Sequence, residues 1–252
     1  MMTITKIVFS PTGGTDRVAD ILARALGDQV VTVDLCDRNT DFSKVEMGDL
    51  AVIAMPCFCG RVPPLAARRL AEIQGEGTSA VVVAVYGNRA YDDLLVETAD
   101  LAEQVGFHVI AGIEAVAEHS IVRDFAKGRP DESDDAQLRL FAAQINNKLI
   151  SVTRSELTLP GNRPYKEYKC GGMVPVADDN CINCGKCAQA CPTGAIAMDD
   201  LKHADATLCM SCMRCIAVCP VNARAIDAEH YEGLKAHLKD VCSVRKEAVL
   251  YI

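Results

Sequence analysis

The sequence lacks any long uninterrupted run of apolar residues. A helix that crosses a membrane needs about 18 or more of them in succession, and no such run occurs in the 252 residues. Residues 1–10 form a short strand-like segment without the pattern of a secretory signal. We therefore expect a soluble, cytoplasmic protein with no membrane insertion.

Basic residues are scarce relative to acidic ones. The formal net charge is -8 at pH 7, and the acidic excess lies in residues 1–160, whereas the two signs balance in residues 161–252. An acidic surface repels nucleic-acid phosphates and anionic lipids and attracts basic proteins. The charge pattern therefore argues against a nucleic-acid partner. A recognisable set of acid/base or nucleophilic side chains is also missing, so no catalytic substrate site is predicted.

Short β-branched runs alternate with helix-length segments over the first 150 residues. Strands are expected at residues 4–9, 30–35, 50–55, 80–86 and 108–117, and helices from about Gly14, Pro63 and Tyr91 and over residues 134–153. Apolar strands separated by helices are typical of a parallel sheet with both faces covered. The pattern predicts an α/β, doubly wound, five-stranded domain.

Prolines and glycines interrupt this pattern around residues 155–176, which is typical of a linker. We predict a first domain at residues 1–155, a linker at 156–176 and a second domain at 177–252. The second domain ends in an amphipathic helix and a strand-like segment at residues 248–252, which could pack on either domain.

Thirteen cysteines without a secretion signal argue against a disulfide framework. Eight of them form two copies of the run Cys-x2-Cys-x2-Cys-x3-Cys-Pro, at residues 181–192 and 209–220. In this run three thiolates bind one 4Fe-4S cluster and the fourth binds the other. One cluster is assigned to Cys181, Cys184, Cys187 and Cys219, and the other to Cys209, Cys212, Cys215 and Cys191.

The alternative for these cysteines is a pair of zinc ribbons, which join two CxxC units across a long gap and have neither the third cysteine nor the Cys-Pro pair. Residues 178–228 resemble the two-cluster bacterial ferredoxins, including the sequence Cys-Pro-Thr-Gly-Ala-Ile at residues 191–196. The resemblance implies a small α+β ferredoxin domain that transfers single electrons at low potential.

The loop between the first strand and the first helix is a candidate phosphate site. It has neither the Walker A lysine nor the Rossmann glycine pattern, but its hydroxyls and backbone N–H groups can hold an anion at a helix N-terminus. An ordinary capping turn is the alternative. The loop resembles the T/S-x-T-G-x-T loop of flavodoxins, which implies FMN and the strand order 2-1-3-4-5. Its residues are Ser10, Thr12, Gly13, Gly14 and Thr15.

The loops after the third and fourth strands should touch the same ligand, because ligands bind at the carboxyl ends of parallel strands. We expect Phe58 and Tyr91 to be the two walls around the flavin ring, and the flavodoxin resemblance implies that a backbone group at Gly60 approaches flavin N5. The second loop resembles the Gly-x-x-x-Tyr-acidic loop of flavodoxins. The candidate residues are Pro56, Cys57, Phe58, Cys59 and Gly60, and Tyr86, Gly87, Asn88, Arg89, Tyr91 and Asp92.

Several of these residues have a second interpretation. Tyr91 could be a core residue, and Arg61 and Arg89 could form surface ion pairs. Cys57 and Cys59 could form a redox pair or simply pack, whereas Cys36, Cys170 and Cys242 have no partner spacing and are expected to be small buried residues. Residues 118–130 follow the fifth strand and could contact the flavin or the cluster domain, or form an ordinary solvated loop.

The whole chain resembles the flavodoxin/ferredoxin fusion proteins of anaerobic bacteria and archaea. This implies an electron-transfer iron-sulfur flavoprotein with FMN and two 4Fe-4S clusters, which serves redox protein partners such as ferredoxin-dependent oxidoreductases. Two alternatives stay open: an FMN-dependent reductase of a small substrate fed by the clusters, and a redox sensor whose first domain lacks FMN. A homodimer could place the flavin of one chain against the clusters of another.

Overall fold

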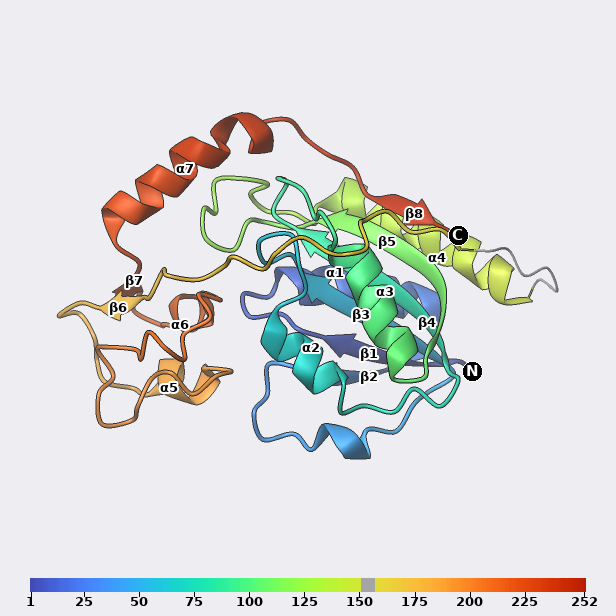
Figure 1. Cartoon of the computed structure of the whole chain (residues 1–252), viewed down its shortest axis with the longest axis horizontal. Helices are drawn as coiled ribbons and strands as arrows, with labels where there is room; N and C mark the ends of the chain where they lie inside the picture. The colour runs from blue at the N-terminus through green and yellow to red at the C-terminus, as the bar shows by residue number, and fades with distance from the viewer. Residues whose placement is uncertain (151–156) are drawn as a thin grey trace.

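A computed structural model describes residues 1–150 and 157–252 of the chain (Figure 1). Its largest feature is a six-stranded sheet with the strand order β2-β1-β3-β4-β5-β8. The first five strands run parallel, and their order is the predicted 2-1-3-4-5. They are β1 (Thr3–Val8), β2 (Gln29–Asp34), β3 (Leu50–Pro56), β4 (Ser79–Tyr86) and β5 (His108–Val116). The predicted doubly wound α/β fold is confirmed.

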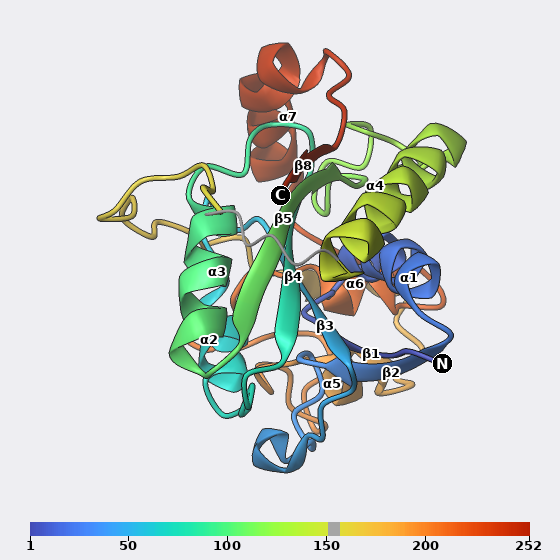
Figure 2. The same ribbon diagram turned by 90° about the vertical axis from the view of Figure 1, so that its right-hand side faces the viewer.

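Two pairs of helices cover the two faces of this sheet (Figure 2). The central strands are apolar along their length because both of their faces are covered. Ile53 in β3 is fully buried, and burial of such a side chain contributes about 1.5–3 kcal/mol. One face carries α1 (Gly14–Leu26) and α4 (Glu132–Ile150), and the other carries α2 (Pro64–Leu70) and α3 (Leu94–Gln104), with a short 3-10 helix η1 (Phe42–Lys44) after β2.

The chain returns to this sheet after α7 (Ala228–Cys242), whose first turn is capped by the Asp227 carboxylate. Strand β8 (Val249–Tyr251) pairs antiparallel with β5, and the Tyr251 hydroxyl donates a hydrogen bond of 2.9 Å to Glu114. The new strand satisfies backbone groups that β5 would otherwise expose at the edge of the sheet. The strand-like segment that could have joined either domain therefore packs on the first, and it adds a sixth strand to the predicted five.

Residues 157–227 contain little regular structure. They hold two short helices, α5 (Lys186–Ala190) and α6 (Arg214–Ala217), and the two-residue strands β6 (Val176–Ala177) and β7 (Arg224–Ala225), which pair antiparallel. The buried apolar cluster of this part consists of Ala188, Ile196 and Cys215. A core this small rarely stabilises a domain without metal ions or cross-links.

This part of the chain lies at the carboxyl ends of the parallel strands (Figure 1). The Arg214 guanidinium of α6 donates a hydrogen bond of 3.2 Å to the Ser10 carbonyl after β1. Arg69 at the end of α2 donates to the carbonyls of Leu35 (2.6 Å) and Pro192 (2.9 Å), and so joins the two parts. The cysteine-rich part is therefore seated on the edge of the sheet at which ligands bind in open α/β folds.

The predicted domain limits stay a prediction. The end of the first domain, the start of the linker and the last residues of the predicted helix at 134–153 all fall in residues 151–156, outside the described residues. Among residues 1–150 and 157–252, no helix is long and apolar enough to cross a membrane.

Candidate functional site

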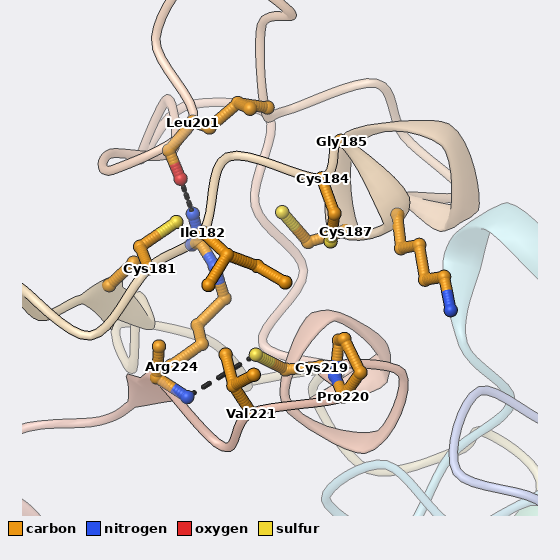
Figure 3. Close-up of a pocket in the computed structure, with 13 residues that line it drawn as sticks. Cys181, Ile182, Cys184, Gly185, Cys187, Leu201, Cys219, Pro220, Val221 and Arg224 are labelled. Carbon is orange, nitrogen blue, oxygen red and sulfur yellow. Dashed lines mark hydrogen bonds between the residues drawn. The ribbon is translucent and has the colours of Figure 1, made fainter.

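The structure brings the eight cysteines of the two runs together as two groups of four. Each group has three thiols from one run and the fourth from the other, which is the arrangement that two-cluster ferredoxin runs require. Cys181, Cys184, Cys187 and Cys219 line one cavity (Figure 3), and Cys191, Cys209, Cys212 and Cys215 line another. The grouping is the one that the spacing predicted, and the binding of iron stays a prediction.

Both cysteine runs use the same backbone turn. Asn183 and Gly185 have positive φ values of 54 and 72 degrees, and the equivalent Ser211 and Met213 have values of 56 and 61 degrees. Such a conformation points successive N–H groups at an enclosed anion. A backbone N–H group also faces a sulfur farther along the second run, where the Ala223 N–H donates a hydrogen bond of 3.3 Å to the sulfur of Cys219. The loops are therefore shaped to hold negatively charged sulfur.

The second cysteine group is the more deeply buried. Burial raises the pKa of the Cys212 thiol to about 11 and that of Cys215 to about 12. Buried thiols of this kind are protonated at neutral pH, whereas coordination to a metal removes the proton outright. The donor set thus suits iron, although no three His, Cys, Asp or Glu side chains among the described residues meet as closely as a single metal ion requires.

Next to this group, a cavity of about 40 Å³ lies at the carboxyl ends of the strands, and we name it the central cavity. It is lined by Cys212 and by loops that follow β1, β3, β4 and β5. Most of the predicted flavin-binding loops therefore meet here. The predicted residues on its wall are Thr12, Gly14, Thr15, Pro56, Cys57, Phe58, Tyr86 and Gly87.

The candidate phosphate loop ends where α1 begins. Gly13 has a φ of 92 degrees and no side chain caps the helix there, so the turn requires glycine. The Ser10 hydroxyl has another partner, because it accepts a hydrogen bond of 2.9 Å from the Asp16 N–H. The structure thus places Thr12 and Thr15 at the central cavity, whereas Ser10 stabilises the loop from within.

A second cavity, of about 320 Å³, adjoins the phosphate loop, and we name it the arginine cavity. Its lining includes Gly13, Arg17 and Arg123. The sequence indicated only hydroxyl and backbone N–H groups as partners of the phosphate, so these two arginines were missed. Arg17 donates to the Pro130 carbonyl (2.9 Å) and Arg123 pairs with Glu118 (2.5 Å). Their guanidinium groups suit a phosphate.

Tyr91 is not a wall of these cavities, contrary to prediction. Its ring lies 5.4 Å from that of Tyr86, and its hydroxyl lies 3.3 Å from the hydroxyl of Tyr251. Strand β8 brings Tyr251 to this position, so Tyr91 packs against the end of the chain. The alternative of a core tyrosine is the one that the structure supports.

His119, unlike Tyr91, is an aromatic ring that lines two of the cavities. It lines the arginine cavity and packs on Gly87, where an added Cβ would lie 2.5 Å from the His119 ring. Its Nδ1 accepts the N–H groups of Ile121 (3.2 Å) and Val122 (3.0 Å). Burial lowers the pKa of His119 to about 4, so the ring is neutral. In the sequence, the position of His119 after the fifth strand was the feature that indicated a place near the ligand-binding edge of the sheet.

Other predicted residues hold the loops in place. Arg61 forms an ion pair of 2.7 Å with Glu97, which supports its interpretation as a salt-bridge residue. The Asn88 side chain donates to the carbonyls of Cys242 (2.7 Å) and Val244 (2.8 Å), and Asp92 pairs with Arg89 and with Lys166 (2.7 Å). At Gly60 a side chain would collide with Asp92, so this position accepts only glycine.

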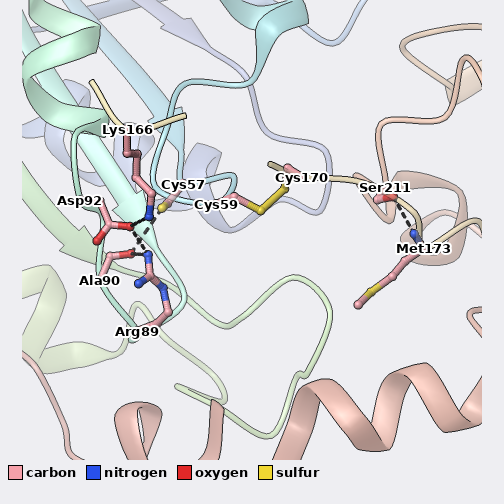
Figure 4. The surroundings of a disulfide bond; sticks show 9 residues. All are labelled: Cys57, Cys59, Arg89, Ala90, Asp92, Lys166, Cys170, Met173 and Ser211. Atoms are coloured by element: carbon pink, nitrogen blue, oxygen red, sulfur yellow. Dashed lines mark hydrogen bonds and ion pairs between the residues drawn. A yellow bond between two sulfur atoms is a disulfide. The ribbon is translucent and has the colours of Figure 1, made fainter. Parts of the chain in front are cut away.

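A third cavity, of about 280 Å³, lies beyond Phe58, and we name it the strap cavity. Its lining includes Cys57, Gly87, Arg89 and His119 from the sheet domain. A disulfide between Cys59 and Cys170 also borders it (Figure 4). Cys57 is not in this bond, and the prediction that Cys170 has no partner is wrong. Sequence spacing gave no signal because 111 residues separate the two cysteines.

Residues 175–227 match the protein family described as the 4Fe-4S dicluster domain. The chain therefore joins a flavodoxin-like fold to a 4Fe-4S dicluster domain. This is the architecture of a flavodoxin/ferredoxin fusion protein, as the sequence predicted. The dicluster match indicates an iron-sulfur protein. Among curated proteins, no match to the fusion protein was found.

Several solved structures are similar to the sheet domain. Rubredoxin oxygen:oxidoreductase from Desulfovibrio gigas is 17% identical, with a TM-score of 0.45 over 58% of this chain and 36% of that one, so the fusion protein spans about a third of its length. Oxidised Flavodoxin 2 from Bacillus cereus is 16% identical, with a TM-score of 0.44 over 59% of this chain and 99% of that one. A Fusobacterium nucleatum flavodoxin bound to flavin mononucleotide is 15% identical, with a TM-score of 0.42 and the same coverage. The fold assignment rests on the strand order and the covering helices.

Proposed function

We propose that the fusion protein carries electrons between one-electron and two-electron redox partners through two 4Fe-4S clusters and one FMN. The clusters supply single-electron transfer, and FMN, which holds one or two electrons, couples it to two-electron chemistry. The proposal extends to the ligands: each group of four cysteines holds one cluster. The partners are redox proteins such as ferredoxin-dependent oxidoreductases.

We propose that FMN binds along the edge of the sheet with its phosphate at the loop of Thr12, Gly13, Gly14 and Thr15. Backbone N–H groups at the start of α1 and the two threonine hydroxyls would donate to the phosphate oxygens, and Arg17 would balance the charge. The ring would lie against Phe58, between the loops after β3 and β4. Glycine is required at residue 87 because a side chain there would collide with His119.

One observation carries this proposal. Cys212, a proposed ligand of the second cluster, lines the central cavity together with Thr12 and Phe58. The residues proposed to hold FMN and a thiol proposed to hold iron therefore share one cavity within a single chain. Arg214 strengthens this contact, because it follows Cys212 by two residues and bonds to the Ser10 carbonyl. Electrons would then pass between cluster and flavin without a second copy of the chain.

The domain limits remain part of the proposal: a flavodoxin-like FMN domain at residues 1–155, a linker at 156–176 and a ferredoxin-like domain at 177–252. Strand β8 is the exception within the last range, because it completes the sheet of the first domain. The ferredoxin-like domain is thus bound to the first at both ends of its chain, which favours a fixed distance between the redox centres.

The first test of this function is the cofactor content of protein purified without oxygen. We expect about eight iron and eight sulfide ions per chain and one FMN released on denaturation. The Thr12→Asp variant places a negative charge in the proposed phosphate loop, so it should lose FMN and keep its iron. Thr40→Asp is the matched control, since Thr40 lies on an exposed loop after β2. Wild-type protein without FMN would refute the proposal.

The second test separates a carrier from an enzyme. Reduced protein is mixed with ferredoxin-dependent protein partners or with small oxidants, and oxidation of the flavin is followed by absorbance. Rapid oxidation by protein partners alone supports the carrier, whereas turnover with a small oxidant alone supports the alternative of an FMN-dependent reductase.

A further inference from the structure

The strap cavity contains a redox group that electron transfer through clusters and flavin does not use. Cys59 follows β3 and Cys170 precedes β6, and their Cα atoms lie 5.7 Å apart in the disulfide (Figure 4). Both cysteines line the strap cavity. Phe58 and Gly87, which belong to the loops proposed to hold the flavin ring, line the same cavity. Cys59 is also exposed to solvent, and Cys170 is half-buried. The disulfide thus borders the proposed flavin site on one side and solvent on the other.

The disulfide is also the main link between the cavity and the segment of residues 167–172, which we name the strap. Within the described residues, no hydrogen bond joins the strap to the rest of the chain. The nearest ones lie at its ends, where Lys166 pairs with Asp92 (2.7 Å) and the Met173 N–H donates to the Ser211 hydroxyl (3.2 Å). Side chains at Gly171 and Gly172 would meet open space. Cleavage of the bond would therefore release the covalent link to the strap without breaking a hydrogen bond.

Cys57 lies in the same cavity but is poorly suited to thiol-disulfide exchange. Its thiol donates a hydrogen bond of 3.3 Å to the Ala90 carbonyl, and burial raises the pKa of Cys57 to about 11. A thiol that stays protonated is a poor nucleophile. Cys57 therefore takes no part in the exchange, although it shares the loop and the cavity with Cys59.

We propose that Cys59–Cys170 is a redox-active disulfide that accepts two electrons from the reduced flavin and passes them to an external disulfide. This inference rests on the proposed function, because it needs FMN as the two-electron donor. In the first step the S–S bond breaks, each sulfur gains one electron and one proton, and fully reduced FMN becomes oxidised FMN.

In the second step the exposed Cys59 thiolate attacks a sulfur of the external disulfide and forms a mixed disulfide. Cys170 then attacks Cys59, which re-forms the original bond and completes the release of two external thiols. The net reaction transfers two electrons and two protons from the chain to the external disulfide. Oxidised glutathione is a small probe for this step.

The test uses holoprotein whose FMN and iron contents have been measured first. The protein is oxidised with excess oxidised glutathione under nitrogen, freed of small molecules and titrated with dithionite. Wild-type protein should take up about two electrons per chain more than the Cys59→Ser and Cys170→Ser variants, because a disulfide is a two-electron couple. Cys242→Ser is the control and should match the wild type, because Cys242 is buried and lines neither the strap cavity nor the central cavity. Equal FMN and iron contents in all four proteins show that the variants are folded.

Alkylation with iodoacetamide and mass spectrometry identify the sulfurs. Cys59 and Cys170 should be unlabelled after oxidation and labelled once the flavin is reduced, and they should stay unlabelled in the FMN-deficient Thr12→Asp variant at the same dithionite dose. Addition of oxidised glutathione to the reduced protein should remove the labelling again.

Three results would overturn the inference: labelling of both cysteines before reduction, equal electron uptake by wild type and Cys59→Ser, or equal labelling with and without FMN. Failure of the proposed function is recognised separately, since wild-type protein would then contain no FMN before the titration begins.

Discussion

The sheet domain and the dicluster domain are stabilised in different ways. The sheet buries long apolar strands on both faces, with clusters of core residues from α1 and α4 on one side and from α2 and α3 on the other. The hydrophobic cluster of the dicluster domain has only three buried members, and eight cysteines lie around two cavities. We therefore expect the first region to fold on its apolar contacts and the second to depend on iron.

Removal of iron is the strongest test of this difference. Chelation under anaerobic conditions should remove the hydrogen-exchange protection of residues 176–227, because a core of Ala188, Ile196 and Cys215 cannot offset the ordering entropy of the backbone. The strands of the sheet should keep their protection. Hydrogen exchange followed by mass spectrometry measures both regions in one sample.

The control for iron removal is the same protein after reconstitution with iron and sulfide, which should regain the protection. If residues 176–227 stay protected without iron, or if the sheet unfolds with them, the proposed division between an apolar and a metal-dependent region is incorrect.

A smaller effect is expected from loss of one ligand. Cys219→Ala should destroy the cluster of Cys181, Cys184 and Cys187, although Cys219 belongs to the other cysteine run, because these four thiols line one cavity. Iron should fall from about eight to about four ions per chain, as measured by chemical analysis. Cys242→Ala is the control, since this cysteine is buried away from both groups and its loss should leave iron unchanged. Loss of all iron in Cys219→Ala would show that the two clusters cannot form independently.

The two regions also differ in how much of them the sequence could predict. In the sheet domain, short runs of apolar and β-branched residues located every parallel strand, because strands that are covered on both faces are apolar along their length. In the dicluster domain, the spacing of the cysteines was sufficient, since cluster geometry dictates it. Each method depends on residues that are near one another in the chain.

The features that the sequence could not provide join residues that are far apart in the chain. Tyr91 fits a flavodoxin loop, yet its position depends on Tyr251 of β8, which pairs with β5 at the other end of the chain. Cys59 and Cys170 are separated by 111 residues, and the sequence around each cysteine does not indicate that the other is its partner. The contact between Arg214 and Ser10 could not be predicted from the sequence either, because it arises from the packing of two domains.

The smallest effect concerns the boundary between the two regions, where His119 lines a cavity that also contains Met213 of the dicluster domain. Burial lowers the pKa of His119 to about 4, below the value of about 6.5 expected in the unfolded chain. The folded state therefore binds fewer protons, so this contribution to stability is complete above pH 6.5 and is lost as the pH falls toward 4. Between pH 6.5 and 5.5 the free energy of unfolding should decrease by about 1 kcal/mol.

His119→Phe would remove this decrease, because phenylalanine cannot bind a proton. Its ring can still pack against Phe125, whose ring centroid lies 6.3 Å from that of His119. Urea unfolding followed by circular dichroism at the two pH values measures the difference, with iron content confirmed before each experiment. Equal pH dependence in wild type and variant would mean that the His119 ring is accessible to water in the folded protein. The boundary would then be open to solvent, and the two regions would be less closely joined than the contacts of Arg69 and Arg214 indicate.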